Sequence, residues 1–142
     1  MDLVWEPPAA LLLRQAIAAV RRSDVTVAFV GLSPELEGEE NSIKLSGFLS
    51  GDRTRLALPA AQEALLRAAT ATGKPLVVVL MSGSAVAVPF AQQHARAILE
   101  AWYPGEAGGT AIAETLAGDN NPAGRLPITF YYYCVINWIP FC

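Results

Sequence analysis

The stretch L-V-V-V-L-M (Leu76–Met81) is the most strand-like run in the chain, because it is apolar throughout and contains three consecutive valines. Such a run is typical of a strand buried on both faces of a parallel sheet. Gly73-Lys74-Pro75 before it is typical of the end of a helix, and the small residues Ser82-Gly83-Ser84 follow it as a turn. The sequence therefore predicts a central strand whose carboxyl end opens at the edge where α/β sheets carry their ligand sites.

Outward from this strand, helix-like and strand-like runs alternate along the chain. Apolar residues at helical spacing predict helices over residues 9–22, 60–72, 88–95 and 106–117. Apolar runs of strand length predict further strands over residues 25–31, 96–102 and 125–131. The alternation predicts an α/β fold, a three-layer α/β/α sandwich with a mostly parallel sheet and right-handed crossovers.

The same patterns predict which side chains face the core. In the second helix the inward stripe is expected to comprise Gln62, Leu65, Leu66 and Ala69. In the last full helix it is expected to comprise Ile112, Ala113 and Leu116. Pro127, which cannot donate to a strand ladder, places the final strand at an edge of the sheet.

Composition excludes several classes of protein. The 142 residues are enough for one domain, and 53% hydrophobic residues with 16% charged ones suit a sheet buried on both faces. A net charge of −3 without a basic stripe argues against a nucleic-acid partner, and no apolar run is long enough to span a membrane. With 1 His and 2 Cys, both in the last nine residues, neither a metal site nor any other cofactor is predicted. The first residues do not resemble a signal peptide, so a cytoplasmic location is the default expectation.

A long acidic loop, Leu32–Leu56, joins the first predicted strand to the second helix. Glutamates crowd its first half, at positions 35, 37, 39 and 40. Crowded carboxylates raise one another's pKa, and a raised carboxyl suits a general acid near neutral pH. Glu37 and Glu39 are the candidates, because Gly38 between them frees the backbone. The alternatives are a solvated acidic flap or a cation-attracting patch, although no calcium-loop spacing is present.

Asp52 and Arg53 close this loop, and Arg53 could make a bidentate contact to one of its carboxylates. An ordinary turn with a surface charge is the alternative. Ser82-Gly83-Ser84 lacks the G-x-S-x-G pattern and His94 has no evident carboxylate partner, so serine-type hydrolysis is not predicted. Trp102, ahead of a Gly-rich turn, could stack on a sugar face or pack in the core.

Five stretches follow one another along the chain: G-L-S-P-E-L-E-G-E-E (Gly31–Glu40), S-G-D-R-T-R-L-A-L-P (Ser50–Pro59), A-T-G-K-P-L-V-V-V-L (Ala71–Leu80), A-I-L-E-A-W-Y-P-G-E-A-G-G-T-A-I-A (Ala97–Ala113) and G-D-N-N-P-A-G-R-L-P-I-T-F-Y (Gly118–Tyr131). In this order they resemble the C-terminal α/β-sandwich domain of glycoside hydrolase family 3, in particular that of bacterial β-xylosidases and β-glucosidases. The ordered set is specific, whereas no single stretch would be.

The resemblance implies hydrolysis of terminal β-linked sugars with retention of configuration. In the family, an aspartate on a preceding barrel domain is the nucleophile, and the sandwich contributes the general acid/base from a loop after a strand. Retaining enzymes hold the two carboxyls about 5–5.5 Å apart. Glu37 and Glu39 match the family's acid/base motif, with a preference for Glu37, and Asp52 and Arg53 match the G-D-R stretch that binds substrate or supports the loop. A β-glycoside substrate and a barrel domain are thus the implied partners.

The chain also departs from the family pattern. No barrel is present, the domain at residues 1–131 is expected to be incomplete at its start, and the apolar tail at 132–142 matches nothing in the family. These departures predict a fragment that is inactive alone, because one carboxylate of the pair is absent. The alternative is a non-catalytic α/β module that binds a sugar or a protein. A flavodoxin-like signalling domain is disfavoured, because no predicted strand ends in an aspartate.

Overall fold

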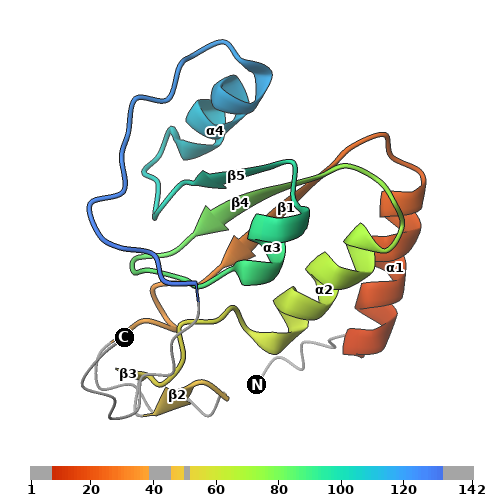
Figure 1. Ribbon diagram of the computed structural model, residues 1–142, viewed down its shortest axis with the longest axis horizontal. Helices are drawn as coiled ribbons and strands as arrows, with labels where there is room; N and C mark the ends of the chain where they lie inside the picture. Colours follow the sequence, from red (N-terminus) through yellow and green to blue (C-terminus); the bar gives the residue numbers. More distant parts are fainter. Residues whose placement is uncertain (1–7, 39–45, 50–51, 133–142) are drawn as a thin grey trace, which may run out of the picture.

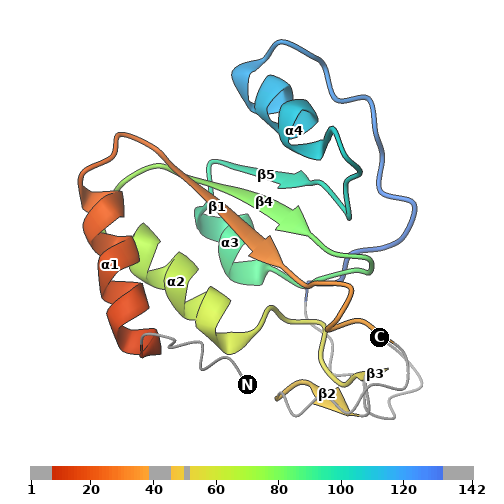
Figure 2. The same cartoon turned by 180° about the vertical axis from the view of Figure 1, so that it is seen from behind.

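A computed structural model describes residues 8–38, 46–49 and 52–132 (Figures 1 and 2). The predicted alternation of helices and strands is confirmed over most of this range. The elements are α1 (Ala9–Arg21), β1 (Thr26–Gly31), β2 (Phe48–Leu49), β3 (Asp52–Arg53), α2 (Ala60–Thr70), β4 (Leu76–Met81), α3 (Pro89–His94), β5 (Ala97–Glu100) and α4 (Gly108–Ala117).

The main sheet has the order β1-β4-β5, and both strand pairs are parallel. β4 is therefore the central strand, as its apolar run predicts. Helices α1, α2 and α3 lie on one side of the strands and α4 lies on the other (Figures 1 and 2). The α/β class and the mostly parallel sheet are thus confirmed. Within the long loop, β2 and β3 form a small antiparallel pair that the sequence pattern does not predict.

The core fills the space between α2 and the sheet. Leu66 of α2 and Val78 of β4 are fully buried, and Leu76 and Leu80 are nearly so. These four belong to one buried cluster that extends to Val20 of α1. Alternate β4 residues, at positions 76, 78 and 80, face this cluster because a strand has a side-chain period of two. In the predicted stripe of α2, Leu66 and Ala69 are buried and the flanking positions are half-buried.

Gln62, the polar member of that stripe, ties α2 to the end of β1. Its side-chain amide donates to the carbonyl of Gly31 at 2.9 Å, and its side-chain oxygen accepts the N–H of Gly31 at 2.8 Å. Gly31 is the last residue of β1 and stands immediately before the acidic loop. The two hydrogen bonds therefore fix the point at which that loop leaves the sheet.

Three expectations about the second face of the sheet and the C-terminal segment are wrong. Residues 125–131 form no strand, because this segment runs past the carboxyl ends of the strands and not beside an edge (Figure 1). In α4 only Ile112 of the expected stripe is buried, while Leu116 is 41% exposed. In β1, Val27 and Phe29 are 41% and 56% exposed, so this strand is buried on one face only. Among the described residues, α4 is the helix on that side, and it lies beside β5 in both views.

The described residues contain no helix of the length and apolar character that crossing a membrane requires. The predicted apolar tail, apart from Tyr132, lies outside the described residues, as do Glu39 and Glu40.

Candidate functional site

The carboxyl ends of β1, β4 and β5 lie at the same edge of the sheet, because parallel strands all end on one side. The first half of the acidic loop follows β1, the turn Ser82-Gly83-Ser84 follows β4, and Tyr103 stands shortly after β5. Side chains from all three segments meet there. The short strand β3 adds Arg53 to the same place.

Glu37 is the centre of this arrangement. One carboxylate oxygen, Oε2, accepts the backbone N–H of Gly83 at 2.7 Å and the hydroxyl of Tyr103. The other oxygen, Oε1, accepts the hydroxyl of Ser84. The side chain is 13% exposed. Three donors, from the ends of two different strands, thus converge on one carboxylate that the acidic loop supplies.

Arg53 lies behind this carboxylate with a side chain only 10% exposed. Its Nη1 stands 3.9 Å from Oε1 of Glu37, so the contact to the loop carboxylate is made through one nitrogen and is not bidentate. The guanidinium donates at 2.7 Å to the hydroxyl of Ser84 and to the carbonyl of Ala85, and at 2.8 Å to the carbonyl of Leu56. Arg53 therefore joins the end of the loop to the turn after β4. Asp52 beside it is exposed, and its backbone pairs with Leu49.

The hydrogen bonds decide the charge of Glu37. Burial acts to raise the pKa of its carboxyl, but the donors Ser84, Tyr103 and Gly83 and the charge of Arg53 outweigh burial and hold the pKa below the ordinary value of 4.5. For Glu37, the expectation that crowded glutamates raise the pKa is therefore wrong. Burial and the neighbouring carboxylate raise the pKa of Tyr103, so its phenol stays a neutral donor. At neutral pH the centre is a carboxylate that only accepts hydrogen bonds.

A second carboxyl, Glu100 at the end of β5, has the opposite character. Its Oε1 accepts the backbone N–H of Trp102 at 3.0 Å, whereas its Oε2 is buried and finds no hydrogen-bond partner among the described residues. Burial raises the pKa of Glu100 to about 7, the hydrogen bond from Trp102 opposes the rise, and the charge of Glu37 adds to it. Sequence reasoning missed Glu100. One sequence feature could have identified it: Glu100 is a carboxylate near the end of an apolar run, at the edge of the sheet where ligand sites lie.

Replacing Glu100 with glutamine is expected to stabilise the chain at pH 8 by about 1–2 kcal/mol, a range discounted for the partial solvent screening of this half-buried group. The folded-state pKa is raised, so the stability that the neutral carboxyl contributes is present below pH 4.5 and is lost as the pH rises through about 7. The gain should therefore vanish near pH 4.5. Urea unfolding at both pH values measures it, with the exposed Glu106→Gln as the control. Equal gains at both pH values would contradict this account.

Two other candidates from the sequence each contact a neighbouring aromatic ring. The half-buried ring of Trp102 lies edge-on against that of Phe130, with 5.9 Å between the centroids, outside the buried core cluster. His94 is exposed at the end of α3, where Nδ1 lies 2.9 Å from the carbonyl of Phe90 and the two rings stack. Within residues 8–38, 46–49 and 52–132, no group of three or more His, Cys, Asp or Glu side chains could hold a metal ion.

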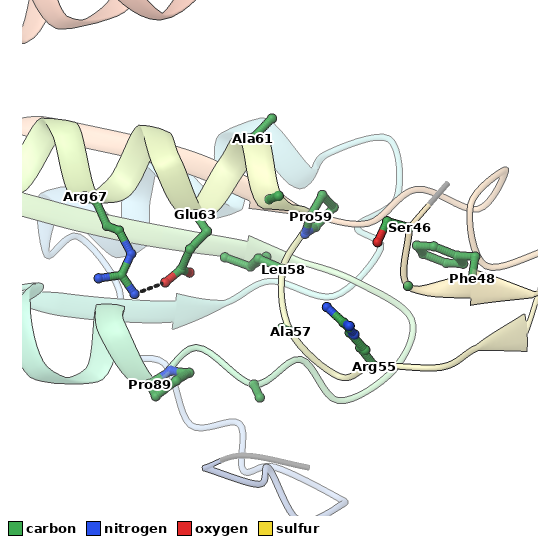
Figure 3. Close-up of a pocket in the computed structure, with 13 residues that line it drawn as sticks. Ser46, Phe48, Arg55, Ala57, Leu58, Pro59, Ala61, Glu63, Arg67 and Pro89 are labelled. Atoms are coloured by element: carbon green, nitrogen blue, oxygen red, sulfur yellow. Dashed lines mark hydrogen bonds and ion pairs between the residues drawn. The ribbon is translucent and has the colours of Figure 1, made fainter. Parts of the chain in front are cut away.

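A pocket of about 430 Å³ lies between the second half of the long loop and the starts of α2 and α3 (Figure 3). Its lining is mostly apolar and includes Phe48, Leu58 and Pro89. The ion pair Arg67–Glu63, at 2.7 Å, lies along one wall. The lining includes none of Glu37, Arg53, Gly83, Ser84 and Tyr103, but its Arg55 and Ala57 flank Leu56, whose carbonyl accepts from Arg53.

The geometry defines an α/β domain that holds an acidic loop against the carboxyl edge of its sheet. The family model described as the glycosyl hydrolase family 3 C-terminal domain matches residues 10–135, and the chain belongs to this family. It is 43% identical over 118 residues to a xylan 1,4-beta-xylosidase of Xylanibacter ruminicola, and this alignment covers 83% of this chain and 14% of the relative. It is 44% identical over 119 residues to a periplasmic beta-glucosidase of Salmonella typhimurium, with 84% and 14% covered.

Solved structures agree with this assignment. A β-glucosidase of Erythrobacter marinus superposes with a TM-score of 0.78 at 36% identity, covering 94% of this chain and 18% of that one. A β-glucosidase of Kluyveromyces marxianus in complex with glucose superposes with a TM-score of 0.76 at 29% identity, with 92% and 14% covered. The chain therefore spans about one seventh of the length of the curated relatives that it matches.

Proposed function

We propose that this chain is the part of a retaining β-glycosidase that supplies the general acid/base carboxylate to a nucleophile on a barrel domain outside the chain. The observation that carries the proposal is the acidic loop, which Glu37 and Arg53 fasten to the carboxyl edge of the sheet. The names of the relatives support β-xylosides or β-glucosides as the substrate class. In such a reaction one carboxyl must protonate the leaving-group oxygen and later activate water.

Between the two candidate glutamates, we assign the acid/base role to Glu39. A general acid must carry a proton near the working pH. The three donors and the nearby guanidinium hold Glu37 in its ionised form, which speaks against its donating a proton. Glu39 follows two residues later, across Gly38. The family resemblance favours Glu37 slightly, and the lowered pKa of Glu37 is the reason to reverse that preference.

The test is a chimera in which this chain replaces the matched segment of the Xylanibacter ruminicola xylosidase. The chimera is expected to hydrolyse an aryl β-xyloside, whereas the 142-residue chain alone is expected to be inactive because it lacks a nucleophile. Glu39→Gln in the chimera should lower kcat/KM for phenyl β-xyloside by about 10²–10⁴-fold, the usual contribution of acid–base catalysis. The matched control is Glu35→Gln, which changes an exposed glutamate in the same loop.

Azide gives a second readout, because it attacks a glycosyl-enzyme without needing a base. Glu39→Gln is expected to regain turnover of an activated dinitrophenyl β-xyloside when azide is added, and to release the xylosyl azide. The proposal is wrong if Glu39→Gln keeps full activity, or if the folded chimera with all native residues is inactive. It is also wrong if the chain alone hydrolyses the glycoside. Saturable sugar binding by the chain, combined with an inactive chimera, would favour a non-catalytic binding module.

A further inference from the structure

We propose that Glu37 is a positioning residue for the acid/base loop: its carboxylate is an anionic clasp that holds the loop to the ends of β4 and β5. The Glu37 clasp comprises Glu37 with its partners Arg53, Gly83, Ser84 and Tyr103. The catalytic part of this inference rests on the proposed function. The clasp itself is a property of the chain and is testable without turnover.

The loop is shaped to direct Glu37 inward. The N–H groups of Leu36 and Glu37 both donate to the carbonyl of Ser33, at 2.9 and 3.0 Å, so the chain makes a single helical turn after β1. Leu32 at the start of the loop is buried, and its N–H donates to the carbonyl of Met81 in β4 at 2.8 Å. The backbone on the near side of Glu37 is therefore held before its side chain makes any contact.

Gly83 is required where the clasp closes. A Cβ at this position would lie 2.8 Å from Cε2 of Tyr103 and 3.1 Å from Oε2 of Glu37. No ordinary Cβ comes that close to a ring carbon, so any larger residue would push the phenol or the carboxylate away. The small turn after β4 thus gives the carboxylate direct access to a backbone N–H.

The contacts of the Glu37 clasp depend on the negative charge of the carboxylate as well as on its size. An ionised carboxylate accepts on both oxygens, and charge-assisted hydrogen bonds are stronger than neutral ones. A glutamine at position 37 would keep the size but would replace one acceptor with an N–H₂ donor. With the amide oxygen toward Gly83 and Tyr103, the N–H₂ would face the Ser84 hydroxyl, which would accept from it and from Arg53 but would lose the acceptor for its own proton.

The clasp restricts the residue that the proposed function assigns to catalysis. Two residues of extended chain span at most about 7 Å. Fixing Glu37 to the sheet therefore anchors the chain two residues before Glu39. Acid catalysis depends on placing a proton donor within hydrogen-bonding distance of the leaving-group oxygen. Loss of the contacts of Glu37 should therefore lower the rate gain from acid catalysis without abolishing it.

The first test uses the 142-residue chain and follows tyrosine ionisation by ultraviolet absorbance, with Tyr103→Phe to assign the signal of Tyr103. In the native chain, Tyr103 is expected to ionise at a higher pH than a free tyrosine, because burial and the neighbouring Glu37 raise its pKa. Glu37→Gln should lower the pKa of Tyr103 markedly and speed amide exchange at Gly83 about tenfold or more. Glu35→Gln should change both far less. Unchanged circular dichroism confirms that each variant is folded.

The second test uses the chimera and compares two leaving groups. A phenyl β-xyloside needs protonation of its leaving group, whereas a dinitrophenyl β-xyloside hardly does. Glu37→Gln is expected to lower kcat/KM for the phenyl substrate about 10–100-fold and to change kcat/KM for the dinitrophenyl substrate less than about threefold, because kcat/KM reports the step in which the leaving group departs. A merely destabilised protein would lose both activities equally, which would refute positioning.

The outcomes separate the two proposals. If the pKa of Tyr103 is ordinary in the native chain, or is unchanged by Glu37→Gln, the clasp is wrong whatever the activity of the chimera. If the clasp behaves as expected while Glu39→Gln leaves the chimera fully active, the proposed function is wrong and the clasp stands.

Discussion

Gly31→Ala is expected to destabilise the chain by at least about 4 kcal/mol, in the range that only severe disruptions reach. A Cβ at this position would lie 1.9 Å from the carbonyl oxygen of Met81 and less than 3 Å from two further backbone atoms of that residue. The backbone cannot move aside, because Gly31 pairs with Met81 in the sheet and Gln62 binds both its N–H and its carbonyl. Gly31 also has a φ of 143°, which side chains rarely adopt.

Thermal unfolding of the purified variant measures this loss, which corresponds to roughly 10–20 °C in Tm for a domain of this size. Gly73→Ala is the matched control, because Gly73 also has a positive φ, of 76°, but nothing lies within 4 Å of its would-be Cβ. Strain alone should cost this control about 1–2 kcal/mol. Similar losses in the two variants would mean that backbone strain matters at Gly31 and that the overlap with Met81 does not.

The local elements were predictable because their signals are local. The valine run of β4 and the apolar spacing of α1 and α2 report burial directly, and the structure has these elements within two residues of the predicted ends. The wrong predictions concern the second face of the sheet and the segment that follows α4. Phe29 has the apolar character of a strand buried on both faces, yet its side chain is 56% exposed. The prediction failed because an apolar pattern does not show which face of a strand a helix covers. Residues 125–131 have the composition of a strand, but they do not run beside an edge strand of the sheet.

The candidate site was predictable in its residues and less so in its chemistry. Crowding of glutamates pointed to Glu37, but crowding alone gives the wrong direction for its pKa, because the donors at Gly83, Ser84 and Tyr103 come from 46 to 66 residues further along the chain. Glu100 was missed for the same reason. Its raised pKa arises from burial, a property of the assembled sheet. Gln62 was placed correctly on the inward stripe, but the pattern could not show that its amide binds the backbone of Gly31.

Arg53→Ala is expected to destabilise the chain by about 3 kcal/mol at pH 7, the low end of the loss for breaking a buried ion pair. The change leaves the carbonyls of Leu56 and Ala85 without the guanidinium and removes the positive charge beside Glu37. Arg53→Lys should recover less than half of the loss, because one ammonium cannot reproduce the planar fork that reaches three acceptors. Asp52→Asn, at the exposed neighbour, should stay within about 0.5 kcal/mol of the native chain.

The pH dependence shows how much of this loss is electrostatic. The folded-state pKa of Glu37 lies below 4.5, so the stability from its ionised form is present above pH 4.5 and is lost as the pH falls through the folded-state pKa. The gap between the native chain and Arg53→Ala, measured by urea unfolding, should therefore narrow below pH 4.5. A residual gap is expected there, because the bonds to the carbonyls of Leu56 and Ala85 do not titrate. A gap that stays constant down to pH 3 would mean that Arg53 acts through those carbonyls alone, and that the Glu37 carboxylate gains nothing from its charge.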